Sequence, residues 1–261
     1  MNADLLDLLD LLDLLDLLHA REGIVCAVGA GGKKTTLKRL FDAHPGRVAL
    51  TATVRTTRFT PEPDVTTLVA PVEELPALVA KGAAATRRVA YARATDKPGR
   101  HAGVPPALIE QLHGGCRFAA TYVKADGARM RWIKAPAEDE PVLPDSCGTV
   151  LTVVSARALG EPLTDRIAHR PERVADVTGA QPGEPIQPGH LARLITSPDG
   201  LLRGTEGRVV VPVINMVDDD ERVRLGTATA EAALERTDRF DYVVLARMQS
   251  AADPVIAVIR R

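Results

Sequence analysis

The feature that most constrains the fold is an apolar run that ends in glycines and continues into a helix-forming segment. Residues 23–28 read Gly-Ile-Val-Cys-Ala-Val, which is typical of a buried strand. Three glycines follow within four positions, and residues 33–43 then have the pattern of a helix. A strand, a glycine turn and a helix in this order predict the first unit of a layered α/β fold.

Further apolar runs alternate with helical segments along the rest of the chain. We expect strands at residues 47–54, 88–93, 117–124, 149–154, 208–214, 242–246 and 254–259, and helices at 73–81, 105–113 and 219–236. Residues 159–207 are rich in proline and glycine and are expected to form a small helical insert or cap. The pattern predicts an α/β fold with a P-loop-like, mostly parallel sheet flanked by helices. This nucleotide-binding domain is expected to span residues 23–261.

An Asp-Leu-Leu repeat occupies residues 4–18 within an N-terminal segment, residues 1–22. Its five aspartates exclude a membrane span, and no basic region precedes it as in a signal peptide. Because a three-residue period does not match the turn of an α-helix, the repeated positions drift around the helix. Leucines would therefore face nearly every side. Two interpretations remain: a helix or tail that packs on the domain, or a helix for self-association or partner docking.

Composition excludes several classes of function. Aromatic residues are 3% of the chain and the net charge is -1, so neither base stacking nor a broad basic field favours nucleic-acid binding. The three cysteines are far apart and form no CxxC pair, which argues against zinc and disulfides. These features predict a cytoplasmic protein that does not enter the membrane.

The glycine turn has the composition of a phosphate-binding loop. Its sequence is Gly29-Ala30-Gly31-Gly32-Lys33-Lys34-Thr35-Thr36. Glycines let backbone N–H groups turn toward an anion, a helix N-terminus attracts negative charge, and a Thr hydroxyl such as that of Thr35 can bind Mg²⁺. The match to G-x-x-x-x-G-K-[ST] is imperfect, because either Lys33 or Lys34 can be taken as the phosphate lysine. Lys33 is expected to be an exposed charge in this turn.

A second motif follows the strand expected at residues 117–124. Asp126 stands at the strand end, where a carboxylate can hold Mg²⁺ directly or through water. A basic segment follows, and its residues Arg129, Arg131 and Lys134 could face phosphates or an anionic substrate. Taken alone, Asp126 would be read as a turn residue, but the neighbouring phosphate loop favours a role in metal binding and catalysis together with Lys33.

A third motif, Asn215-Met216-Val217-Asp218, follows the strand expected at residues 208–214. It resembles the N-K-x-D sequence with which GTP-binding domains read guanine, with Met216 in place of the lysine. The alternative is a strand-end turn whose acidic residues begin the next helix. The two interpretations are equally supported, so both ATP and GTP remain candidates.

Taken together, these residues resemble the selenium cofactor biosynthesis protein YqeC family. The resembling segments are 28–33, 51–57, 125–129, 134–137 with 140–144, 169–170 and 215–218. They run in family order and span residues 23–245, and the block from Ala125 to Pro144 is the most specific. This sequence departs from the family pattern at three positions. The family usually has Thr or Ser at the position of Lys34, Glu at that of Lys124, and Lys at that of Met216.

The resemblance implies a cytosolic, P-loop-like nucleotide-binding protein that is accessory to selenium-dependent molybdenum hydroxylases. Its ligands would be ATP or GTP with Mg²⁺, and its partner a molybdenum or selenium hydroxylase or that enzyme's cofactor. Three functions remain open: an NTPase or phosphoryl-transfer enzyme in cofactor maturation, a nucleotide-binding regulator or scaffold with little turnover, and a ligase-type ATP enzyme.

Overall fold

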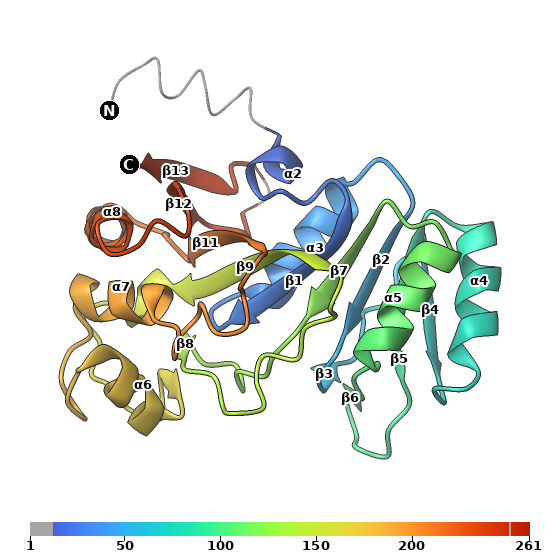
Figure 1. Ribbon diagram of the computed structural model, residues 1–261, viewed down its shortest axis with the longest axis horizontal. Coiled ribbons are helices and arrows are strands. Elements are labelled where there is room, and N and C mark those ends of the chain that lie inside the picture. Colours follow the sequence, from blue (N-terminus) through green and yellow to red (C-terminus); the bar gives the residue numbers. More distant parts are fainter. Residues whose placement is uncertain (1–12, 251) are drawn as a thin grey trace.

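The computed structural model describes residues 13–250 and 252–261. One large sheet runs through the molecule (Figure 1). Its strands are β1 (Gly23–Gly29), β2 (Val48–Ala52), β4 (Val65–Ala70), β5 (Arg88–Arg93), β7 (Ala120–Lys124), β9 (Cys147–Ser155), β11 (Val209–Asn215), β12 (Tyr242–Ala246) and β13 (Val255–Arg260). They lie in the order β13-β12-β11-β9-β1-β7-β2-β5-β4, and only β13 is antiparallel to its neighbour. The predicted α/β fold with a mostly parallel sheet is therefore confirmed.

Helices cover both faces of this sheet. Their bounds are α2 (Leu14–Leu17), α3 (Lys33–Ala43), α4 (Leu75–Ala85), α5 (Pro106–Gly115), α6 (Pro171–Thr178), α7 (Pro188–Thr196) and α8 (Asp220–Leu234). Alternate residues of β1 explain the two layers: Val25 and Ala27 pack in one core with α2 and α3, whereas Ile24 and Cys26 pack in another with α4 and α5. Because β1 is buried on both faces, it is apolar throughout rather than alternating.

Two short ribbons lie outside the large sheet. They are β3 (Thr56–Thr57) with β6 (Arg100–His101), and β8 (Ile133–Lys134) with β10 (Ala168–His169). Residues 159–207, the proline- and glycine-rich segment, contain α6 and α7, which share a third apolar core with α8 and the neighbouring strands. In Figure 1, α6 and α7 lie beside β8 at the opposite end of the molecule from α4 and α5.

The end of the Asp-Leu-Leu repeat packs on the domain. Leu15, Leu17 and Leu18 are buried in the core that contains α3. Tyr242 donates a hydrogen bond to the carbonyl of Leu17 at 2.6 Å, which ties this segment to β12. Residues 4–12 of the repeat, on which the self-association interpretation depends, lie outside the described residues.

None of the helices within residues 13–250 and 252–261 combines the length and apolar character that crossing a membrane requires.

Candidate functional site

All three sequence motifs lie at one edge of the sheet. β1 pairs in parallel with β7 on one side and β9 on the other, and β11 pairs in parallel with β9. The carboxyl ends of these strands therefore meet, which is where open α/β sheets bind ligands. Gly29, Asp126 and Asn215 follow or end three of these strands, so the structure brings them together.

The glycines of the loop are required by its close packing. Gly29, Gly31 and Gly32 all have positive φ angles, of 90°, 82° and 124°. A Cβ atom on Gly32 would lie 2.1 Å from Nδ2 of Asn215, and one on Gly31 would lie 2.5 Å from Cβ of Ser155. The loop thus allows no side chain at these positions, and its backbone follows the strand ends closely.

Within residues 13–250 and 252–261, no side chain caps the backbone amides at the N-terminus of α3. The residue before the helix is Gly32, which has no side chain, and the first turn contains no acidic residue. Lys34 and Thr35 are exposed there, whereas Thr36 is buried and donates to the carbonyl of Gly32 at 3.2 Å. Free N–H groups and the helix dipole together favour an anion at this point.

Lys33 lies inside the loop rather than on its surface. Its side chain is 5% exposed, and its Nζ donates to the carbonyl of Gly29 and lies 2.8 Å from Oδ1 of Asp126. The expectation of an exposed lysine is therefore wrong, because α3 begins with this residue and turns it back over the end of β1. Burial lowers the pKa of Lys33, and the charge of Asp126 opposes this effect.

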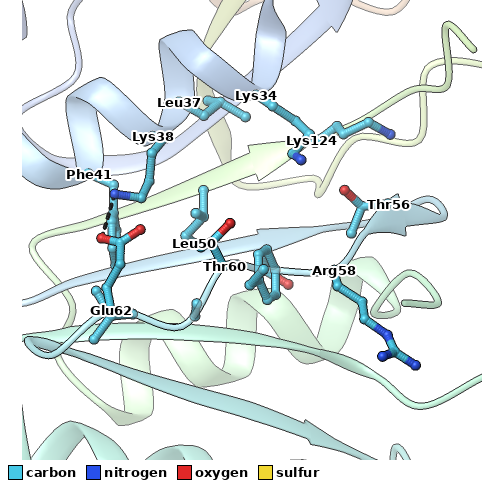
Figure 2. A pocket seen from close by; sticks show the side chains of 14 residues that line it. Lys34, Leu37, Lys38, Phe41, Leu50, Thr56, Arg58, Thr60, Glu62 and Lys124 are labelled. Carbon is cyan, nitrogen blue, oxygen red and sulfur yellow. Dashed lines mark hydrogen bonds and ion pairs between the residues drawn. The ribbon is translucent and has the colours of Figure 1, made fainter. Parts of the chain in front are cut away.

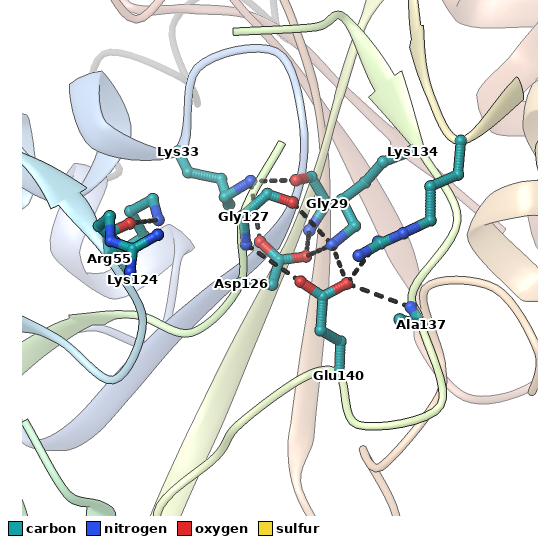
Figure 3. A network of polar contacts seen from close by, with 10 residues as sticks. Gly29, Lys33, Arg55, Lys124, Asp126, Gly127, Lys134, Ala137 and Glu140 are labelled. Atoms are coloured by element: carbon teal, nitrogen blue, oxygen red, sulfur yellow. Dashed lines mark hydrogen bonds and ion pairs between the residues drawn. The ribbon is translucent and has the colours of Figure 1, made fainter. Parts of the chain in front are cut away.

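Asp126 is the buried centre of the polar network in Figure 3. Its Oδ2 accepts a hydrogen bond from the Gly29 N–H at 2.8 Å and lies 3.0 Å from Nζ of Lys134. Its Oδ1 faces Lys33, but it receives no hydrogen bond of good geometry from the described residues. Asp126 thus holds the first residue of the loop and balances two buried ammonium groups.

Lys134 and Glu140 extend the network away from the loop. Lys134 is fully buried, pairs with Glu140 at 2.7 Å and donates to the carbonyl of Gly127 at 2.8 Å. Arg170 also pairs with Glu140 at 2.7 Å. Burial alone would raise the pKa of Glu140, but hydrogen bonds from Lys134, Ala137 and Arg170, together with the charge of Lys134, lower it to about 2.

Sequence reasoning gave Glu140 and Arg170 no role and expected Lys134 to face phosphates or an anionic substrate, whereas the structure buries Lys134 between Asp126 and Glu140. All three lie in the segments that carry the family resemblance, but Arg170 reaches Glu140 only when the chain folds across 30 residues. One available signal was a lysine enclosed by the apolar residues Ile133 and Ala135, since buried lysines need partners. His169 lies beside this cluster, and burial followed by the charges of Arg170, Lys134 and Arg129 lowers its pKa to about 4.

Arg129 lies on an exposed loop that touches the glycine loop through its backbone. Arg129 and Met130 have positive φ angles of 45° and 64°, and the carbonyl of Arg131 accepts a hydrogen bond from the Gly31 N–H at 3.2 Å. The loop is thus held against the glycine loop, and the guanidinium of Arg129 is left at the surface.

Asn215 joins two segments of the site. Its Nδ2 donates to the carbonyl of Gly31 at 2.8 Å, and its Oδ1 accepts from the Met248 N–H at 2.9 Å. The amide group is buried and its hydrogen bonds are used within the protein. Asp218 is instead exposed and pairs with Arg157 at 2.7 Å.

Replacing Asn215 with alanine should lower the free energy of unfolding by about 2–4 kcal/mol, because two buried backbone groups lose their partners. Urea unfolding followed by circular dichroism measures this loss. Asp218→Ala is the matched control at the exposed end of the same motif, and we expect it to change stability little. Equal stabilities of the two variants would show that Asn215 does not hold the loop.

The chain has relatives among known proteins. The chain matches the family described as YqeC protein over residues 25–172, which include the glycine loop, Asp126, Lys134, Glu140 and Arg170. It is 29% identical over 194 residues to the uncharacterized protein YqeC of Escherichia coli (strain K12), covering 70% of this chain and 71% of that protein. No solved structure was found to match. The chain belongs to the YqeC family.

Proposed function

We propose that the chain is a cytoplasmic, NTPase-like nucleotide-binding protein that assists maturation of the selenium- or molybdenum-containing cofactor of hydroxylases. The observation that carries nucleotide binding is the uncapped N-terminus of α3 with Lys33 folded over the glycine loop. The cofactor role rests on the family resemblance, and its partner would be such a hydroxylase or its cofactor.

The phosphates of ATP or GTP would occupy the space in front of Gly32, Lys33 and Lys34. Their oxygens would accept hydrogen bonds from the first amides of α3, which no side chain of the described residues caps. Lys33 is the phosphate lysine in this arrangement, because its Nζ already lies across the loop at the carbonyl of Gly29. Lys34 points elsewhere, since its Nζ donates to Oγ1 of Thr57.

Asp126 would be one of the residues that hold Mg²⁺ at this site. Oδ1 of Asp126 has no hydrogen bond of good geometry among the described residues, so a Lys33 ammonium that turned toward phosphate would free it. Thr35, which is exposed in the first turn of α3, would supply a second oxygen. A metal bound there would neutralise phosphate charge.

A regulator or scaffold with little turnover is the second candidate function. One observation favours it: Asp126 already faces two ammonium groups, those of Lys33 and Lys134, at 2.8 and 3.0 Å. A carboxylate neutralised in this way attracts Mg²⁺ less strongly. In that case nucleotide would bind and change the conformation of the loop without efficient hydrolysis.

Nucleotide titration with and without Mg²⁺, followed by assays of phosphate release, separates these functions. Binding with release of phosphate supports the enzyme, and binding alone supports the regulator. Trapping of an acyl phosphate would instead identify the ligase-type reaction. If neither ATP nor GTP binds in calorimetry, the nucleotide-binding proposal is wrong. Selenium and molybdenum contents of hydroxylases from cells with and without this protein test the cofactor role.

The base preference can be tested at Asp218. If its carboxylate reads guanine, GTP should bind at least about tenfold more tightly than ATP, because adenine would leave that carboxylate without its two N–H partners. Asp218→Ala should remove this difference in affinity. Asp220→Ala, which changes the exposed first residue of α8, should retain it. Asp218 must leave Arg157 to do this. Equal affinities of GTP and ATP in the unaltered protein would refute guanine reading.

A further inference from the structure

A pocket beside the glycine loop lies on the side of α3 that faces β2 and the segment after it. The apolar part of its lining consists of Leu37, Phe41, Leu50, Phe59, Val65 and Ala90. The cations of its lining are Lys34, Lys38, Arg58 and Lys124. Its water-accessible volume is about 120 Å³, which suits a small organic molecule rather than a polymer. Figure 2 shows the side chains that surround it.

The charges of this pocket are unbalanced at one end. Lys38 is paired with Asp42 and with Glu62, at 2.6 and 2.7 Å, and Figure 2 shows the Lys38–Glu62 pair at the far end from Lys34 and Lys124. Within residues 13–250 and 252–261, no carboxylate forms an ion pair with Lys34 or Lys124. Unpaired cations above an apolar floor are the arrangement that binds an anion attached to an apolar body.

Lys124 is the more deeply enclosed of the two lysines. It is the last residue of β7, and its Nζ donates to the carbonyl of Arg55 at 3.1 Å. Burial lowers its pKa to about 7, and the charge of Lys33 adds to this effect, whereas the Asp126 carboxylate opposes it. The charges of Lys134 and Glu140, which lie further from the pocket, also lower and raise this pKa, respectively. Lys34 also has a lowered pKa, through burial and then the charge of Arg100. The carbonyl of Arg55 is uncharged and does not balance the charge of Lys124. An anion bound in the pocket would neutralise that charge.

We propose that this pocket binds a small organic anion, with its charged group between Lys34 and Lys124 and its apolar body against Leu50 and Phe59. The site is separate from the phosphate site proposed above, because Lys33 and Asp126 do not line it. It shares only the exposed start of α3, through Lys34, with that site. A molecule bound here would lie next to a nucleotide held at the loop.

Benzoate and its uncharged analogue benzamide are suitable probes, because they have the same size and differ in charge. Saturation-transfer NMR and calorimetry on the full chain should give binding of benzoate at least tenfold tighter than that of benzamide. Lys124→Met should weaken benzoate binding tenfold or more and leave benzamide binding unchanged. Lys38→Met is the matched control in the same pocket, and it should have little effect because the charge of Lys38 is already balanced.

Phenyl phosphate provides a second probe. Calorimetry with this compound, carried out as for benzoate, distinguishes a phosphate ester from a carboxylate as the preferred anion.

The proposal is overturned if benzoate and benzamide bind equally, or if Lys124→Met and Lys38→Met have the same effect on benzoate. Failure of this proposal can be distinguished from failure of the proposed phosphate site. Lys33→Met tests nucleotide binding and should not abolish benzoate binding, because Lys33 does not line the pocket. Loss of nucleotide binding with retained benzoate binding therefore concerns the loop alone.

Discussion

Replacing Asp126 with alanine should lower the free energy of unfolding by about 3–5 kcal/mol, the usual cost of removing one member of a buried ion pair. The change leaves Lys33 without an acidic partner and Lys134 with Glu140 alone. It also removes the acceptor of the Gly29 N–H. Urea unfolding followed by circular dichroism measures the loss. If the alanine variant does not fold, Asp126→Asn keeps the shape and an acceptor oxygen, and should lose less.

The double variant Asp126→Asn with Lys33→Met tests the electrostatic cause. It removes one of the two ammonium groups that Asp126 balances, so it should recover part of the stability that Asp126→Asn loses. Asp139→Asn is a control at an exposed carboxylate on the next loop. If Asp126→Asn and Asp139→Asn unfold at the same urea concentration, the buried network does not stabilise the fold.

Replacing Lys33 with methionine should weaken Mg²⁺-nucleotide binding about 10- to 100-fold, because a charged hydrogen bond to phosphate contributes about 1.5–3 kcal/mol. Methionine keeps most of the apolar stem, and Asp126 retains Lys134 and the Gly29 amide, so the protein should remain folded. Calorimetric titration with ATP and GTP gives the affinities.

Two further variants identify which lysine binds phosphate. Lys34→Met should have a smaller effect on nucleotide affinity than Lys33→Met, because its ammonium group points to Thr57 and the neighbouring pocket. Lys81→Met, on α4 at the opposite face of the sheet, controls for the change of net charge. Unchanged affinity in both Lys33→Met and Lys34→Met would rule out the phosphate loop.

The apolar runs predicted most of the sheet because strands of a parallel sheet are buried on both faces. Residues 88–93 and 242–246 were predicted with the bounds that β5 and β12 have, and residues 33–43 with those of α3. β4 was not predicted. It is an edge strand whose residues are mostly half-buried or exposed, and threonines interrupt its apolar pattern. Its position depends on β5, which local sequence does not reveal.

The candidate site was predictable where it is local. Gly29 to Thr36 form a continuous loop and helix start, and their sequence carries the signal of an anion site. The burial of Lys33 and the double hydrogen bonding of Asn215 were not predictable, because each depends on residues far along the chain. Asn215 packs against Gly32 and bonds to the carbonyl of Gly31, so a single side chain joins positions 184 residues apart.

The central position of β1 also determines when this protein can fold during synthesis. β1 is synthesised before the other strands of the sheet, whereas both of its neighbours, β7 and β9, follow several elements later. Gly29 and Asp126 are 97 residues apart, so at about 5–20 residues per second a ribosome needs roughly 5–20 s between them. During that time β1 is an unpaired apolar segment on the nascent chain, a target for chaperones. The loop is completed later still, when Met248 leaves the ribosome and reaches Asn215.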